Sequence, residues 1–105
     1  MPILPVLCVS ADIIRQKFNE NHLYEKTLTG EIHKIVKRNS HCEPPPKGEP
    51  FCTHSQIVYY YDKSNNPLAI VHQYLRPDGK LGASGLPDPK KLIMDDKILM
   101  VKREK

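Results

Sequence analysis

The sequence has no tryptophan and only three cysteines, and apolar residues make up 39% of its 105 residues. A chain of this length predicts one domain, and the low apolar share predicts one modest core. No stretch approaches the roughly 20 apolar residues that a membrane-spanning helix needs. An odd number of cysteines excludes a complete disulfide framework. These absences exclude a membrane protein, a large multidomain enzyme, a coiled coil and a repeat protein.

The N-terminus also lacks the pattern of a secretory signal. Its apolar run, residues 3–9, has no basic region before it and contains Pro5. We therefore expect a single domain over residues 1–105, located in the cytoplasm and without a membrane partner.

No unbroken run of basic residues marks a nucleic-acid-binding tail, although the formal net charge is +4. The excess of basic residues falls in the C-terminal half of the chain. This charge favours anionic partners, but scattered lysines that keep a small domain soluble would give the same composition.

The first secondary structures are predicted by proline and by a capping residue. Pro5 confines residues 3–9 to an edge strand or an extended lead-in. Ser10 can cap a helix over residues 11–21, in which Ile14 and Phe18 are four positions apart and share one face. We expect that face to pack on the core.

Residues 22–40 allow two interpretations. Thr29 could cap a helix that starts near Gly30, or the segment could form two short β segments about a turn at these two residues. The β-branched residues favour a strand over residues 31–38, with Gly30 in the turn before it.

The second half of the chain has the clearest pattern. Residues 55–62 and 68–76 are β-branched and aromatic and predict a β-hairpin. A Gly/Pro-rich loop over residues 77–91 follows, and residues 92–94 and 97–103 predict a short final pairing. The expected fold is α+β, with one or two helices packed on a small antiparallel sheet of three to five strands. This order is loosely similar to that of small ribonuclease toxins of the barnase–colicin–RelE type, in topology alone.

A Pro-rich loop over residues 39–54 contains a candidate metal site. Cys42, Cys52 and His54 are residue types that bind zinc, and the spacer between the cysteines can close a loop. The paired Cys-x-x-Cys spacing typical of structural zinc is missing. Two reduced thiols, or a disulfide that ties the loop, would account for the same residues.

The predicted hairpin places three polar side chains on one sheet face. Alternation along a strand puts His72, Tyr74 and Arg76 on the same side. These groups could form a catalytic site for a phosphodiester, in which His72 moves a proton and Arg76 holds the phosphate. His54, at the start of the partner strand, is the candidate for a second proton-transfer group. A solvated sheet face commonly carries the same residue types.

The Gly/Pro-rich loop contains a candidate phosphate-binding segment. Gly82 and Gly85 flank Ser84, so the backbone could expose successive N–H groups to an anion, with Lys90 nearby. The glycine spacing is that of neither a P-loop nor a dinucleotide-binding motif. An ordinary turn between two strands explains the same residues.

Three consecutive tyrosines complete the candidate features. Alternation sends Tyr59 and Tyr61 to one face and Tyr60 to the other, where packing against the helix is expected. Aromatic and basic side chains on one sheet face are typical of proteins that bind single-stranded RNA.

Two functions follow from these features. The first is a small basic domain that interacts with nucleic acid, with metal-independent cleavage of RNA as its enzymatic form and no cofactor. The second is a non-catalytic module that binds another protein through the Pro-rich loop or an exposed sheet edge. The expected partner is RNA or another anionic ligand in the first case and a protein in the second.

Overall fold

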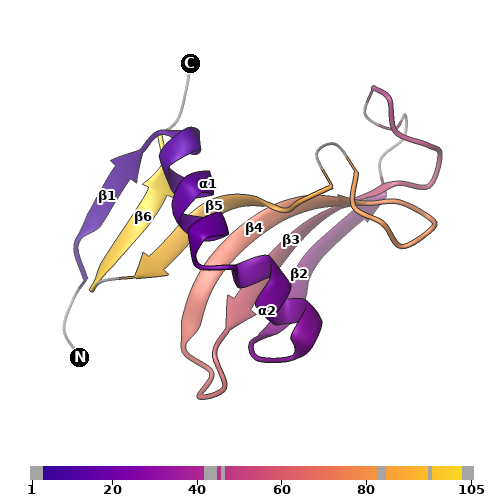
Figure 1. The fold of residues 1–105 in the computed structure, drawn as a ribbon. Helices are drawn as coiled ribbons and strands as arrows, with labels where there is room; N and C mark the ends of the chain where they lie inside the picture. The colour runs from indigo at the N-terminus through magenta and orange to yellow at the C-terminus, as the bar shows by residue number, and fades with distance from the viewer. Residues whose placement is uncertain (1–3, 42–44, 46, 83–84, 95, 103–105) are drawn as a thin grey trace.

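The computed structural model describes residues 4–41, 45, 47–82, 85–94 and 96–102. Two helices and six strands follow one another along the chain (Figure 1). In chain order they are β1 (Val6–Val9), α1 (Ala11–Glu20), α2 (Leu23–Thr29), β2 (His33–His41), β3 (His54–Tyr61), β4 (Pro67–Leu75), β5 (Asp88–Met94) and β6 (Lys97–Val101).

All six strands form one mixed sheet in the order β1-β6-β5-β4-β3-β2. The α+β class is confirmed, but the predicted three to five antiparallel strands are wrong, because β1 adds a sixth strand parallel to β6. Local sequence patterns identify strands without identifying their partners, and these two lie at opposite ends of the chain. β5 also begins at Asp88, inside the predicted 77–91 loop.

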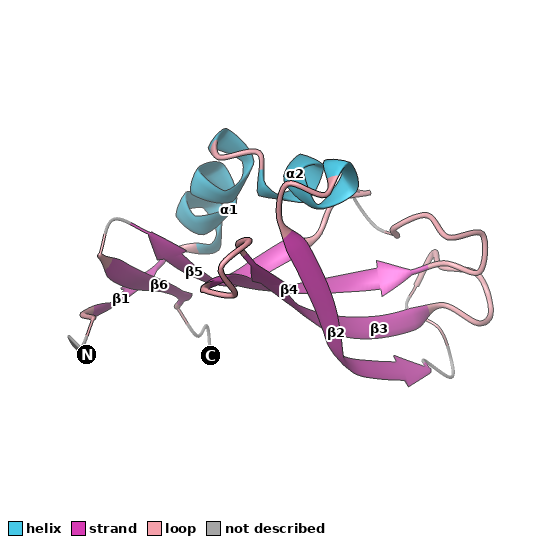
Figure 2. Ribbon diagram, turned by 90° about the horizontal axis from the view of Figure 1, so that it is seen from below, coloured by secondary structure: helices cyan, strands magenta, loops and turns pink. Residues whose placement is uncertain are grey.

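α1 attaches the helical layer to the sheet. The Ser10 side chain caps it by accepting a hydrogen bond from the backbone N–H of Ile13 at 3.3 Å. Ile14 and Phe18 are buried, and the Phe18 ring lies 5.8 Å from the ring of Tyr60 on β3. The predicted capped helix and its buried face are confirmed. Figure 2 shows both helices on the same side of the sheet.

The ambiguous segment resolves into a helix and a strand. α2 occupies residues 23–29, where one interpretation placed a β segment, and Gly30 ends it with a left-handed backbone at φ 83°. β2 then confirms a strand in this segment, but it begins at His33 rather than at residue 31 and extends to His41. Glycine is favoured at the C-terminal end of a helix because it adopts a positive φ without a side-chain clash.

The predicted hairpin forms from β3 and β4, and its side chains separate the two faces of the sheet. Val58 and Tyr60 of β3 and Val71 of β4 are fully buried beneath the helices. The residues between them are only partly buried. We call the side of the sheet opposite the helices the open face.

Candidate aromatic surface and adjoining pocket

Aromatic side chains gather on the open face of β2, β3 and β4. The ring centroids of Tyr59 and Tyr61 lie 6.4 Å apart, and His33 stacks on Tyr61 at 5.6 Å. The ammonium of Lys37 lies 5.6 Å from the centroid of the Tyr59 ring. β4 contributes His72, whose ring meets that of its neighbour Tyr74 edge-on at 4.7 Å. We call these six residues the aromatic face. The predicted placement of Tyr59 and Tyr61 opposite Tyr60 agrees with the burial of the last.

His72 carries the titratable ring of this surface. Its Nε2 shares a hydrogen bond of 2.7 Å with the hydroxyl of Ser55 on β3. Burial lowers the pKa of His72 below its ordinary value, and the positive charge of Lys90 lowers it further, while Asp88 acts in the opposite direction. The ring is therefore neutral near pH 7 and can accept a proton.

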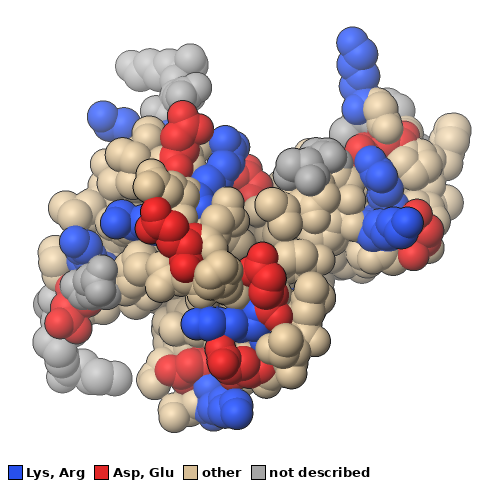
Figure 3. Space-filling model, in the orientation of Figure 1, with Lys and Arg blue, Asp and Glu red and all other residues tan. Residues whose placement is uncertain are grey.

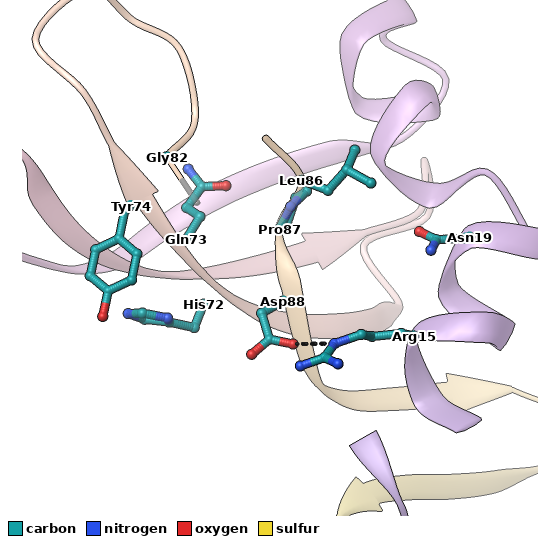
Figure 4. Close-up of a pocket in the computed structure, with 9 residues that line it drawn as sticks. All are labelled: Arg15, Asn19, His72, Gln73, Tyr74, Gly82, Leu86, Pro87 and Asp88. Atoms are coloured by element: carbon teal, nitrogen blue, oxygen red, sulfur yellow. Dashed lines mark hydrogen bonds and ion pairs between the residues drawn. The ribbon is translucent and has the colours of Figure 1, made fainter. Parts of the chain in front are cut away.

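A pocket of about 430 Å³ adjoins His72 at the end of the sheet. It is lined by Arg15 and Asn19 of α1, by residues 72–74 of β4, and by Gly82 and residues 86–88 (Figure 4). Because side chains alternate along β4, the rings at 72 and 74 and the amide of Gln73 lie on different sides of this strand.

The pocket exists because the pairing of β4 with its neighbour is interrupted. The N–H of Gly82 donates to the carbonyl of Tyr74 at 2.8 Å, and regular pairing resumes where Asp88 stands opposite His72. The described residues between these two points, 85–87, have no strand pairing with β4. Leu86 and Pro87 then form the far wall of the pocket.

Asp88 ties the pocket to α1. Its Oδ1 accepts from Arg15 Nε at 3.1 Å, and its Oδ2 accepts from Lys90 Nζ at 2.8 Å. Burial alone would raise the pKa of Asp88, but hydrogen bonds and charge from Lys90 and Arg15 outweigh it, and the pKa is lowered. Asp88 is therefore ionised at neutral pH, and the two cations around it leave a local excess of positive charge.

Gln73 ends a row of side-chain amides. Its Nε2 donates to Gln56 Oε1 at 2.8 Å, and Gln56 Nε2 donates to Asn39 Oδ1 at 3.3 Å. Asn39 Oδ1 also accepts from Nδ1 of His54 at 2.9 Å. The side-chain oxygen of Gln73 is buried and has no hydrogen-bond partner among the residues that the structure describes.

The predicted phosphate-binding Arg76 has a different partner. Its Nε and Nη2 donate to the two carboxylate oxygens of Glu49 at 2.8 and 3.1 Å. This pair raises the pKa of Arg76 and attaches the Pro-rich loop to the end of β4. Arg76 does not line the pocket with His72, and Arg15 is the guanidinium found there instead.

The predicted glycine loop uses its backbone donors internally. The N–H of Gly82 donates to Tyr74, and that of Gly85 donates to the carbonyl of Gly82 at 3.0 Å. Ser84 lies outside the described residues. Lys90 pairs with Asp88, close enough to His72 to affect its pKa. Phosphate binding by this loop stays a prediction, with two of its N–H groups already engaged.

His54 and His72 are not brought together. His54 lies two residues from Gln56 and so shares the helix side of β3, whereas His72 stands opposite Ile57 on the open face. The ring of His54 instead meets that of His41 edge-on at 5.2 Å. The expected pair of proton-transfer histidines is therefore divided between the two faces of the sheet.

The proposed metal site is only partly described. Cys42 lies outside the described residues, and Cys52 is exposed with a left-handed backbone at φ 68°. Within the described ranges, no group of three His, Cys, Asp or Glu side chains is arranged to hold a metal ion. Zinc binding by Cys42, Cys52 and His54 stays a prediction.

Arg15, Asn19, Gln73 and Asp88 were not predicted from the sequence as site residues. Arg15 and Asn19 are four apart on α1, each directly after a buried residue and so on the flank of the buried face, and that spacing was the available signal. Gln73 and Asp88 have no comparable local signal, because their roles depend on where β5 begins.

Charges of both signs cover the helix side of the molecule. Figure 3 shows Lys and Arg side chains interspersed with Asp and Glu over α1 and α2. This face therefore offers no continuous positively charged surface to an anionic polymer such as a nucleic acid. The aromatic face, on the other side of the sheet, is the better candidate surface.

These features define a class: a small α+β protein whose six-stranded mixed sheet carries helices on one side, an aromatic face on the other and a pocket at its end. Comparisons with protein-family models, with curated proteins and with solved structures give no match. Among the described residues, neither helix is long and apolar enough to span a bilayer.

Proposed function

We propose that this protein binds single-stranded nucleic acid, with RNA as the expected form, across its aromatic face. The observation that carries the proposal is a sheet face without helices that presents tyrosine and histidine rings beside lysine. The helices lie on the opposite side of the sheet (Figure 2), and on the aromatic face His33 is exposed while Tyr59 and Tyr61 are only partly buried.

Both parts of this surface suit a single strand. Bases stack on aromatic rings regardless of sequence, and lysines attract the phosphates between them. Lys37 lies over Tyr59, and Lys91 of β5 stands opposite Ile70 in the register that faces the same side. A bound single-stranded nucleic acid would therefore cross β3 and β4 with a lysine on either side.

Removing rings from this surface tests the proposal. Each of Tyr59→Ala and Tyr61→Ala is expected to weaken binding of a short labelled RNA about tenfold, since stacking contributes roughly 1–3 kcal/mol per base. Fluorescence anisotropy measures the affinity. Tyr60→Phe is the matched control, because Tyr60 lies fully buried beneath α1 and should not contact RNA.

The salt dependence gives an independent criterion. Phosphate contacts release counterions, so affinity should fall steeply between low and physiological salt. An affinity that does not change with salt concentration, or that is retained after both Tyr59 and Tyr61 are replaced, would contradict the proposal.

Cleavage of the bound RNA stays a prediction. It needs a proton acceptor, and the neutral ring of His72 can serve. The predicted partner His54 lies on the other side of the sheet, so nothing here pairs the two rings.

Binding of another protein is the second candidate function. It is favoured by the length and exposure of β2, an edge strand whose nine residues are all exposed. An extended peptide could pair with this edge. Lys34→Pro would block such pairing without touching the aromatic rings. Loss of partner capture with RNA affinity retained would assign the edge to proteins.

A further inference from the structure

We infer that His41 and His54, which are paired across the end of β2 and β3, bind a divalent transition-metal ion through their ring nitrogens. Zn²⁺ is the expected ion, with water in its remaining coordination positions. This ligand pair differs from the cysteine-containing set that the sequence predicted. The inference goes beyond the proposed function and does not rest on it.

The first step is the register of the two strands. His41 is the last residue of β2 and His54 is the first of β3, and they are direct partners in the antiparallel ladder. Residues in such a pair have Cβ atoms about 4.5–5.5 Å apart and side chains on the same face. Both rings therefore extend from neighbouring backbone positions that the sheet holds in place.

The second step is the separation of the rings. The ring centroids of His41 and His54 lie 5.2 Å apart, and the ring planes meet at 88°. Two imidazoles that bind one tetrahedral zinc ion through nitrogens at about 2.0–2.1 Å have ring centres about 5 Å apart. The rings therefore already have the spacing of a chelating pair. Rotation of the two side chains is enough to direct a nitrogen of each towards a shared ion.

The third step is the tautomer of His54. Asn39 Oδ1 accepts a hydrogen bond from Nδ1 of His54 at 2.9 Å and another from Nε2 of Gln56 at 3.3 Å. Because a carbonyl oxygen only accepts, Nδ1 of His54 carries the hydrogen, and Nε2 keeps the lone pair that a metal ion needs. Histidine ligands commonly donate their other N–H to an oxygen in this way, which fixes the ring and raises its basicity.

The fourth step is access and the choice of ion. His41 is exposed and His54 is partly buried, and this end of the two strands lies beyond both helices (Figure 1 and Figure 2). Water can therefore complete the coordination. Imidazole suits zinc, copper and nickel, whereas Mg²⁺ prefers oxygen ligands. No group of three His, Cys, Asp or Glu side chains is arranged for a metal ion in the described ranges, so the ion would have two protein ligands.

The position of the pair gives the bound ion a structural consequence. β2 ends at His41 and β3 begins at His54, so residues 42–53 of the Pro-rich loop connect the two ligands along the chain. A bound ion would crosslink the two strand ends. A ligand that binds only the folded protein stabilises it, so zinc should raise the melting temperature of the full chain.

Calorimetric titration with zinc sulfate tests the site, with the full chain free of any histidine tag. We expect one zinc ion per chain and no binding of Mg²⁺. His41→Asn and His54→Asn should each weaken zinc binding by about 100-fold, because a chelate loses its advantage when either ligand is removed. His22→Asn is the matched control. It removes an exposed histidine at a left-handed position that asparagine also adopts, and should leave zinc binding unchanged.

A second pair of variants tests the role of Asn39. Asn39→Ala removes the oxygen that holds the His54 ring and should weaken zinc binding about 10–100-fold. Gln56→Met removes the other hydrogen bond to the same oxygen and should retain zinc binding. Thermal melts of both variants without metal check that the fold is retained.

NMR spectra of the unmodified chain make the test independent of any variant. Zinc should shift the ring resonances of His41 and His54 and leave those of His72 unchanged. Three results would overturn the inference: no zinc binding by the full chain, zinc binding that needs only one of the two histidines or neither, or zinc binding that is lost in Cys42→Ser or Cys52→Ser. The last result would assign the ion to the predicted cysteine-containing set instead.

Discussion

At the scale of the residue, His72 shows how the surroundings set the chemistry of a side chain. Burial and Lys90 lower its pKa, and Ser55 holds its Nε2. A histidine whose pKa is lowered on folding binds its proton more tightly in the unfolded chain. His72 therefore contributes stability above its unfolded pKa of about 6.5, which is lost as the pH falls through the lower folded value.

The same shift makes a kinetic prediction if the protein cleaves RNA. His72→Ala should reduce cleavage by about 10²–10⁴-fold, the usual contribution of a general base. The acid limb of the wild-type rate profile should lie below pH 6.5, because the ring stays neutral to a lower pH than a free histidine. Rates of cleavage of a labelled RNA against pH provide the measurement.

His54→Ala is the control for that prediction. Its ring points to the helix side, so cleavage should be retained. Cleavage at the wild-type rate in His72→Ala would rule out a role for His72 as the base.

At the scale of the element, the segment between β4 and β5 is held by contacts with the Pro-rich loop. The Glu49 side chain is 7% exposed and forms two hydrogen bonds with Arg76. Gly82 packs directly against that carboxylate, and a Cβ at this position would overlap it. Gly82 is therefore needed for close approach, and its backbone N–H is already donated to Tyr74.

This close approach predicts the effect of a single methyl group. Gly82→Ala should lower the free energy of unfolding by about 1–3 kcal/mol, the usual cost of overpacking. Urea denaturation measures the loss. In a background that carries Glu49→Ala the same substitution should cost much less, since the group it displaces has been removed. Equal costs in both backgrounds would show that the Glu49 contact is not the cause.

At the scale of the whole molecule, stability depends on one layer of helix packed against one sheet. Phe18 and Ile14 of α1 meet Tyr60, Val58 and other buried residues of the sheet in a single core. Within the described part of the chain, no helix covers the open face (Figure 2). A small protein of this kind has a total stability of about 5–15 kcal/mol, so one core contact is a large part of it.

Truncating the Phe18 side chain, and so removing its contact with the core, should destabilise the entire fold. Phe18→Ala is expected to lower the free energy of unfolding by about 3–5 kcal/mol, because it leaves a cavity beneath α1. Ile13→Ala, on the same helix at a residue that is 44% exposed, should cost much less. Urea denaturation of both variants makes the comparison, and similar losses would contradict this account of the core.

Local features of the sequence determined the parts of the fold that depend on near neighbours. Ser10 caps α1, Ile14 and Phe18 form its buried face, and alternation separates Tyr59 and Tyr61 from Tyr60. These results follow from side-chain periods of a helix and a strand, which are readable within a few residues.

Only the tertiary structure decided which distant residues meet. The parallel pairing of β1 with β6, the start of β5 at Asp88 and the pairing of Arg76 with Glu49 join segments far apart in the chain. The same long-range pairing brings Arg15 to Asp88 and leaves the side-chain oxygen of Gln73 buried without a hydrogen-bond partner among the described residues. Local periodicity does not predict such contacts, because they depend on strand order and register across the whole sheet.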